Sequence, residues 1–209
     1  LEGIKPSDAV DEATKTAYIG EVRYIRAWLY FCMGRTLGGV PIINDEIFNY
    51  TPGMDITTLQ IPRSTEADLY DYVISECQEA SKMLTKDTNK TSARANYWVA
   101  KMLEARAALT AASLATYNTA EAHPQLRTNG GEVGIPFSKA QEYYKIALAA
   151  AKDVIENGPY KLMLASEQTH KAYADNFYKA VCQKDGNTEV IWCLRGKHIS
   201  SLKETCPKV

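Results

Sequence analysis

A long segment between two predicted helices contains the residue types best suited to hold a polar ligand. It runs from Gly38 to Pro62 and combines short amides and a carboxylate with aromatic rings. Amides and carboxylates bind hydroxyl groups, and a flat ring covers the apolar face of a sugar. The candidate ligand-binding residues are Asn44, Asp45, Phe48, Asn49 and Tyr50. Long ordered loops are often functional, so we predict ligand contact here, with solvated loop chemistry as the alternative.

Two arginines, Arg23 and Arg26, lie three residues apart in an otherwise apolar helical pattern, on neighbouring positions of one helix face. One interpretation is a pair that grips a ligand. The other is structural, with each guanidinium pairing with a carboxylate or with helix-end carbonyls of an adjacent helix. We favour the structural interpretation.

Five aromatic residues present the same choice between ligand stacking and packing. They occur at helical spacing, so we predict that they pack in the core rather than stack on sugars. These residues are Trp28, Tyr30, Phe31, Tyr97 and Trp98.

Motifs for catalysis and for metal binding are absent from the sequence. It contains no Gly-x-Ser-x-Gly, no His-Glu-x-x-His and no phosphate-binding glycine-rich loop. Nothing selects two carboxylates as a glycosidase pair. The gaps between Cys182, Cys193, His198 and Cys206 match none of the usual zinc-ligand spacings. We therefore predict that the protein is not an enzyme and binds neither a metal nor a cofactor.

Composition is that of an ordinary globular protein. The 209 residues are 45% hydrophobic and 23% charged, enough for one domain or two small ones. The formal net charge is −1, which disfavours nucleic-acid binding. The longest apolar stretches are too short and too interrupted to span a bilayer.

Hydrophobic periodicity predicts five helices, at about 8–36, 65–84, 93–116, 139–157 and 166–181. Apolar residues recur on one face of each of the first four. In the first they are Tyr18, Val22, Ile25, Leu29 and Met33. In the second they are Leu69, Val73, Cys77, Ala80 and Leu84. In the third they are Trp98, Met102, Ala105, Leu109 and Ala112. In the fourth, the predicted inner face is Ala140, Tyr144, Ala147, Ala151 and Val154.

Capping residues set several helix ends. Gly38-Gly39 ends the first helix, and Thr65 with Asp68 resembles a capping box at the start of the second. Ser138 with Gln141 predicts a second capping box, and Gly158 suits a left-handed position after the fourth helix.

Helices in series, each with an apolar face, usually pack as antiparallel hairpins. The predicted fold is predominantly all-α: stacked hairpins in an irregular, tetratricopeptide-like α-solenoid. It has long loops at 38–62 and 117–136, and a short strand or extended segment near 188–195.

The stretch from Glu21 to Phe31, followed by Leu37 to Ile43, resembles the E-x-R-x-x-R-A-x-x-Y and G-x-V-P signature of the SusD/RagB family. Further pieces follow in the family's order, at Pro62–Thr65, Lys101–Ser113, Tyr144–Leu162, Asn176–Tyr178 and Glu189–Trp192. The signature positions, to which the resemblance gives a structural role, are Glu21, Arg23, Arg26, Gly39 and Pro41.

The resemblance implies a helical lipoprotein on the surface of a bacterial outer membrane, where its partner is a SusC-type TonB-dependent transporter. Family members capture glycans, or in some cases peptides, and pass them to this transporter. They are longer than this chain, so we interpret residues 1–209 as a single, incomplete N-terminal helical region. The C-terminal ligand-binding half would be missing, and the N-terminal lipid anchor would lie upstream.

The leading hypothesis is therefore a surface oligosaccharide-binding component of a SusC/SusD-type uptake system. The alternative is a tetratricopeptide-like scaffold or a peptide-binding SusD-like protein, which exposed Lys or Arg in a polar groove would favour. A truncated helical stack would expose an apolar face, so we also predict self-association of the isolated chain.

Overall fold

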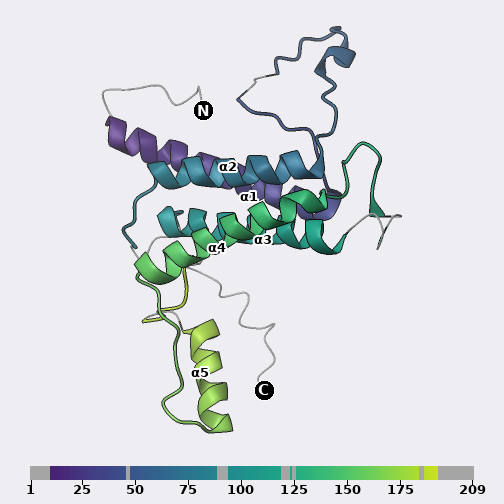
Figure 1. The fold of residues 1–209 in the computed structure, drawn as a ribbon. Helices are drawn as coiled ribbons and strands as arrows, with labels where there is room; N and C mark the ends of the chain where they lie inside the picture. Colours follow the sequence, from purple (N-terminus) through teal and green to yellow (C-terminus); the bar gives the residue numbers. More distant parts are fainter. Residues whose placement is uncertain are drawn as a thin grey trace, which may run out of the picture. The chain divides into compact units, whose positions relative to one another are not determined.

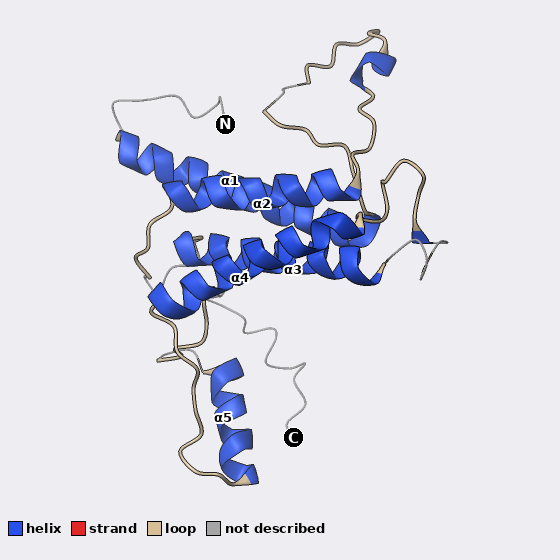
Figure 2. Cartoon of the chain, in the orientation of Figure 1, coloured by secondary structure: helices blue, strands red, loops and turns tan. Residues whose placement is uncertain are grey.

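The computed structural model describes residues 10–45, 48–88, 94–118, 123, 126–183 and 186–192. Over these ranges the chain is helical and contains no β-strand (Figure 1, Figure 2). The α-helices are α1 (Glu12–Leu37), α2 (Glu66–Met83), α3 (Tyr97–Tyr117), α4 (Ala140–Asn157) and α5 (His170–Cys182). Short 3-10 helices are η1 (Ile56–Leu59) and η3 (Phe137–Lys139). The predicted all-α class is confirmed.

The chain divides into two compact units. The first, Leu1–Lys86 with Ala95–Pro159, contains α1 to α4, and the second, Asp87–Arg94 with Tyr160–Val209, contains α5. The interpretation of residues 1–209 as one region stays a prediction. No helix among the described residues is long and apolar enough to cross a membrane.

Helices α1 and α2 form an antiparallel pair that packs closely at two glycines of α1. A Cβ atom at Gly20 would lie 2.9 Å from the Cβ of Met83, and one at Gly34 would lie 2.9 Å from Cδ2 of Leu69. The start of α1 therefore meets the end of α2. Two small positions on one face explain why α2 packs on this side of α1.

Helices α2, α3 and α4 continue the antiparallel order. Gln78 on α2 donates a hydrogen bond to Glu104 on α3 at 2.9 Å. Tyr97, at the start of α3, donates to Asp153, near the end of α4, at 2.6 Å. The alanine-rich packed faces of α3 and α4 allow close approach of the two helices. The first unit is thus a stack of antiparallel hairpins, as predicted.

The Thr65 half of the capping box predicted for the second helix is confirmed, and the box predicted for the fourth helix does not form. Thr65 accepts a hydrogen bond from the Asp68 N–H at 3.0 Å, which satisfies one free donor of α2. In α4 the predicted bounds, about 139–157, are close to those observed, but the predicted cap is wrong at both ends. Ser138 lies within η3, and the N-cap position is Lys139, which makes no side-chain capping bond. Gly158 is extended, with φ −79° and ψ 156°, rather than left-handed.

The apolar face of α2 is confirmed, because all five predicted residues are buried. On α1 the predicted stripe points outward, and Tyr18, Val22, Ile25 and Leu29 are 39–56% exposed. The buried face of α1 instead carries Gly20, Tyr24, Ala27, Tyr30, Phe31 and Gly34. Both sides of α1 are apolar, and the side with the glycines packs against α2.

The predicted faces of α3 and α4 are partly wrong. On α3, Met102 and Leu109 are 37% and 54% exposed, whereas the other three predicted residues are buried. On α4, Tyr143 and Ala150 are buried where Tyr144 and Ala151 were predicted. The Tyr143 hydroxyl donates to Asp71 on α2 at 2.6 Å, which turns this side of α4 inward.

In the second unit, residues 161–163 lie beside residues 188–189. The Lys161 N–H donates to the Thr188 carbonyl at 3.0 Å, and the Met163 N–H donates to the Glu189 carboxylate at 2.6 Å. Of the predicted strand or extended segment, residues 189–192 are loop, and Cys193 and Leu194 lie outside the described residues.

Candidate functional site

The loop between α1 and α2 projects from the bundle, and its two ends are tied together (Figure 1). The Ser64 N–H donates to the Val40 carbonyl at 3.2 Å. Arg63 donates to the Gly39 carbonyl at 2.7 Å and to the Leu37 carbonyl at 2.6 Å. The loop thus has a fixed base on which its exposed residues are carried.

Close backbone contact at this base leaves no space for side chains at Gly38 and Gly39. A Cβ atom at Gly39 would overlap the Ser64 carbonyl oxygen, and one at Gly38 would overlap the Glu132 carbonyl oxygen. Gly38 also has φ +74°, in the left-handed region that favours glycine. The Gly39 N–H donates to the Glu132 carbonyl at 2.6 Å. The predicted helix end at this glycine pair is therefore confirmed.

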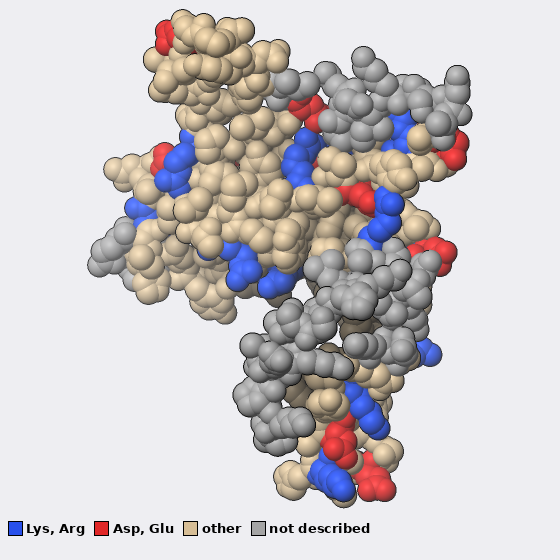
Figure 3. All heavy atoms as spheres, turned by 180° about the vertical axis from the view of Figure 1, so that it is seen from behind, with Lys and Arg blue, Asp and Glu red and all other residues tan. Residues whose placement is uncertain are grey.

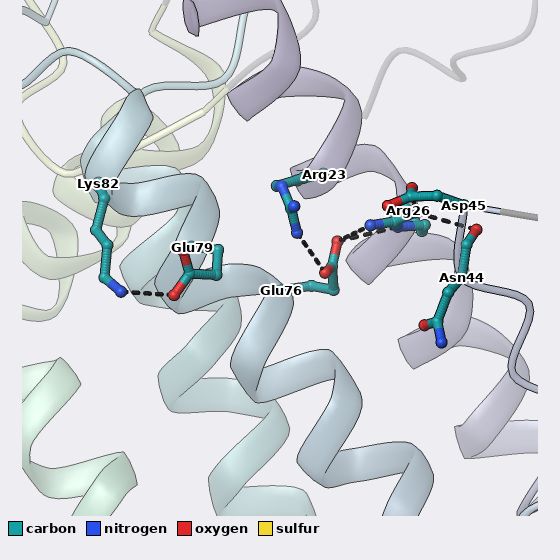
Figure 4. A network of polar contacts seen from close by, with 7 residues as sticks. All are labelled: Arg23, Arg26, Asn44, Asp45, Glu76, Glu79 and Lys82. Atoms are coloured by element: carbon teal, nitrogen blue, oxygen red, sulfur yellow. Dashed lines mark hydrogen bonds and ion pairs between the residues drawn. The ribbon is translucent and has the colours of Figure 1, made fainter. Parts of the chain in front are cut away.

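Two residues one turn apart on α1 hold the first part of the loop. Arg26 Nη1 donates to the Asp45 carboxylate at 2.8 Å and to the Asn44 carbonyl at 3.3 Å. The Tyr30 hydroxyl accepts the Ile43 N–H at 2.8 Å. Two of the predicted ligand-binding residues, Asn44 and Asp45, are thereby placed at the surface of α1 (Figure 4).

The other side of Arg26 reaches a buried carboxylate on α2. Glu76 is 5% exposed and accepts from Arg26 Nε at 2.9 Å, from Arg26 Nη2 at 2.7 Å and from Arg23 Nη1 at 2.7 Å (Figure 4). Two charge-assisted bonds from one planar guanidinium fix its orientation. Both arginines therefore pair with an adjacent helix, the geometry that the structural interpretation requires. Glu21, the third charged signature residue on α1, is partly buried.

Electrostatics favour the ionised form of Asp45. The hydrogen bond and positive charge of Arg26 hold the pKa of the Asp45 carboxyl below its usual value, with a smaller effect from Arg23. The Cζ atom of Arg26 lies 5.9 Å from the ring centroid of Tyr72 on α2. Burial raises the pKa of Tyr72 to about 12. The base of the loop therefore presents the Asp45 carboxylate, held by the Arg26 guanidinium, whose other edge binds Glu76.

The remaining candidates, Phe48, Asn49 and Tyr50, follow on the projecting part of the loop. Phe48 is 40% exposed and Tyr50 is 64% exposed, and Asn49 is exposed as well. Their rings and amide are thus accessible to a ligand. That they bind one together with Asn44 and Asp45 stays a prediction.

Sequence reasoning did not single out Glu76, nor Glu66 at the first turn of α2. Glu66 is 4% exposed and accepts the Gly134 N–H at 2.5 Å, which fastens the second long loop to α2. Burial raises the pKa of Glu66, and the Gly134 bond and Arg127 oppose that effect. For Glu76 a signal existed, because it lies three residues after Val73 and four before Ala80, two members of the predicted apolar face of α2.

A polar hollow in the second unit was also not predicted. It lies between residues 163–169 and α5, and its lining includes Glu167, Lys171, Asp175 and Asn176. The Asn176 side chain donates to the Met163 carbonyl at 2.5 Å and so joins the two sides.

No group of three or more His, Cys, Asp or Glu residues suited to a metal ion occurs among the described residues. Of the four residues considered for zinc, Cys182 is an exposed free cysteine on α5. Cys193, His198 and Cys206 lie outside the described residues.

Comparisons with known proteins give matches at the level of structure. No family model matches the chain, and no curated protein matches it significantly. A SusD-like protein from Bacteroides fragilis superposes with a TM-score of 0.61 at 21% identity, over 92% of this chain and 30% of that one. A SusD-like carbohydrate-binding protein from the same species has a TM-score of 0.50 at 18% identity, over 73% and 23% of the two chains.

A third structure, with xylogluco-oligosaccharide, has a TM-score of 0.52 at 25% identity and matches 78% of this chain and 27% of its own. The chain therefore has the SusD-like fold that its signature residues predicted. The match spans less than a third of each of these three proteins.

Proposed function

We propose that this chain, which has the SusD-like fold, belongs to a surface glycan-binding protein without catalytic activity. It captures oligosaccharides and passes them to a SusC-type TonB-dependent transporter in the outer membrane. A lipid anchor holds the complete protein at the cell surface. The carbohydrate-binding protein and the xylogluco-oligosaccharide complex among the similar structures support this class of ligand.

One observation carries the proposal: a projecting loop with a fixed base presents exposed rings next to polar groups. Tyr50 and Phe48 are accessible for stacking, and Asn49 and Asp45 are accessible for hydrogen bonds to hydroxyl groups. An open, hydrated surface of this kind binds with modest affinity, which suits capture followed by release.

The test is a glycan-array screen of the complete protein, followed by calorimetry on each glycan that binds. Phe48→Ala and Tyr50→Ala are compared with Ile56→Ala, which removes another exposed apolar side chain of the same loop. Loss of one stacked ring weakens binding roughly three- to tenfold. We expect this loss for Phe48→Ala and Tyr50→Ala and none for Ile56→Ala.

Each other outcome has a distinct meaning. Glycan binding that is indifferent to Phe48 and Tyr50 would move the site away from this loop but leave glycan capture standing. Binding of peptides in place of glycans would establish the alternative, a peptide-binding protein with stacked helical hairpins.

A further inference from the structure

The candidate loop carries no basic residue. Between Gly38 and Pro62 the sequence has no Lys, Arg or His, but it has Asp45, Glu46 and Asp55. Figure 3, in which the projecting part of the loop lies at the upper left, shows no basic side chain on that part. A ligand approaching the loop therefore meets negative charge, which opposes carboxylate or sulfate groups.

The arginines at the base of the loop keep their positive charges, but those of Arg23 and Arg26 are offset by Glu76 and Asp45. Most N–H donors of Arg26 are also used within the protein. Four bonds from Arg26 go to Glu76, Asp45 and Asn44. A guanidinium has five N–H donors, so an anionic ligand would have to displace Asp45 or the Asn44 carbonyl to obtain a bidentate contact. At the other end of the loop, Arg63 donates to two backbone carbonyls.

Resting on the proposed function, we infer that the loop site selects uncharged oligosaccharides over acidic ones, and that Arg26 is a positioning residue and not an anion ligand. Glu76 holds the guanidinium, the guanidinium holds Asn44 and Asp45, and these two residues meet the ligand.

The Arg26–Asp45 pair is better placed than an ordinary surface ion pair. An exposed pair is usually weak, because two flexible side chains must both be ordered. Here the Arg26 side chain is only 18% exposed and is already oriented by Glu76, whereas the Asp45 side chain is 47% exposed. Only the loop side loses freedom when the contact forms, and about half of Asp45 stays accessible to a ligand.

The test compares three chemical forms of each of three oligosaccharides, with the complete protein. Xylogluco-, cello- and malto-oligosaccharides are used unmodified, with primary hydroxyls oxidised to carboxylates, and with those carboxylates converted to methyl esters. Calorimetry is run at about 0.02 M and about 0.5 M sodium chloride, between which the Debye length falls from roughly 20 Å to roughly 4 Å. The ester matches the acid in size but lacks its charge.

We expect the acid to bind roughly tenfold more weakly than the ester at low salt, with the gap closing at high salt. Asp45→Asn narrows the gap at low salt, because it removes one of the repelling charges. An acid that binds as well as the ester would overturn the inference and leave glycan capture standing. A difference in affinity between acid and ester that does not change with salt would also overturn it, because shape and not charge would then disfavour the acid. If no form of any glycan binds, the proposed function itself fails.

The positioning role has a readout that needs no ligand. Arg26→Gln should speed amide hydrogen exchange at Ile43, because the Ile43 N–H donates to Tyr30 next to the two residues that Arg26 holds. Arg23→Gln, which also removes a bond to Glu76 but keeps the contacts of Arg26 with the loop, should not. Rescue of slow exchange by Arg26→Lys would be partial, since an ammonium lacks the planar fork. Equal exchange in the Arg26→Gln and Arg23→Gln variants would overturn the positioning role.

Discussion

Glu76 on α2 accepts two hydrogen bonds from Arg26 on α1, at 2.9 Å from Nε and 2.7 Å from Nη2, while only 7% of the Glu76 side chain is exposed. This pair connects the packed interior of the first unit to the loop, because the same guanidinium reaches Asp45. A change at Glu76 should therefore be felt in two places, the stability of the helix pair and the order of the loop.

Glu76→Ala should lower the free energy of unfolding by about 3 kcal/mol, because it leaves two partly buried guanidinium groups without their shared carboxylate. Urea denaturation measures the change. Glu79→Ala is the matched control on the same helix, since Glu79 pairs with Lys82 at the exposed surface (Figure 4). Equal unfolding midpoints for the two variants would contradict the interior role of Glu76.

For Glu66 we predict a contribution to the free energy of unfolding that declines as the pH rises. Its pKa is raised in the folded protein, chiefly by burial, so its contribution is full below the ordinary glutamate pKa and is lost as pH rises through the folded value. Glu66→Gln keeps an acceptor for Gly134 without the buried charge. Relative to this variant, the wild-type chain should lose stability between acidic and neutral pH, as followed by denaturation across a pH series.

For Asp45 we predict a pH dependence of stability with the opposite sign. The pKa of its carboxyl is lowered, first by the hydrogen bond from Arg26, so its contribution is present above the ordinary aspartate pKa and is lost as pH falls through the folded value. The free energy of unfolding of the wild-type chain, relative to that of the Asp45→Asn variant, should therefore decrease as the pH is lowered. The effect is small, because the side chain is 47% exposed and solvent screens the pair. A difference that stays flat with pH would argue against the Arg26 contact in solution.

Gly39→Ala should destabilise the base of the loop strongly, by roughly 2 kcal/mol or more, because the new methyl group would overlap the backbone of Ser64. Gly53→Ala is a control on the same loop. Gly53 has φ +88° but no atom within 4 Å of its Cβ position, so only the backbone conformation costs, about 1 kcal/mol. Thermal unfolding of both variants separates the cost of atomic overlap at position 39 from the cost of backbone strain at position 53. If Gly39→Ala unfolds like wild type, the close contact with Ser64 is not maintained.

The sequence predicted the existence of each helix better than the face that each one buries. The second helix was correct throughout, since only one of its faces is apolar. On α1, Ile25 and Phe31 are equally apolar, and periodicity alone does not choose between their faces. What decides is the neighbour: Gly20 and Gly34 admit α2 closely on one side. In α4, Tyr143 is drawn inward by Asp71, a partner 72 residues away that no local pattern includes.

The candidate site was predictable to a similar extent. The residue types in the loop indicated a polar ligand, and the arginine spacing indicated a pair on one helix face. The shared partner Glu76 is separated from Arg23 by 53 residues, so only the tertiary structure reveals that one carboxylate serves both arginines. The fastening of the second loop by Glu66 likewise joins residues 68 apart.

The outward stripe of α1 leads to the last prediction, on association of the isolated 209-residue chain. Tyr18, Val22, Ile25 and Leu29 recur at helical spacing and are 39–56% exposed, so they form one continuous apolar face on α1. Contiguous exposed apolar surface promotes association.

We expect concentration-dependent self-association by light scattering, suppressed by the double change Ile25→Lys and Leu29→Lys. Ile56→Lys, at an exposed apolar residue of the loop, adds the same kind of charge elsewhere and should leave association unchanged. A wild-type chain that is monomeric at all concentrations would refute this prediction, and equal suppression by Ile56→Lys would show that added charge, not loss of the α1 stripe, prevents association.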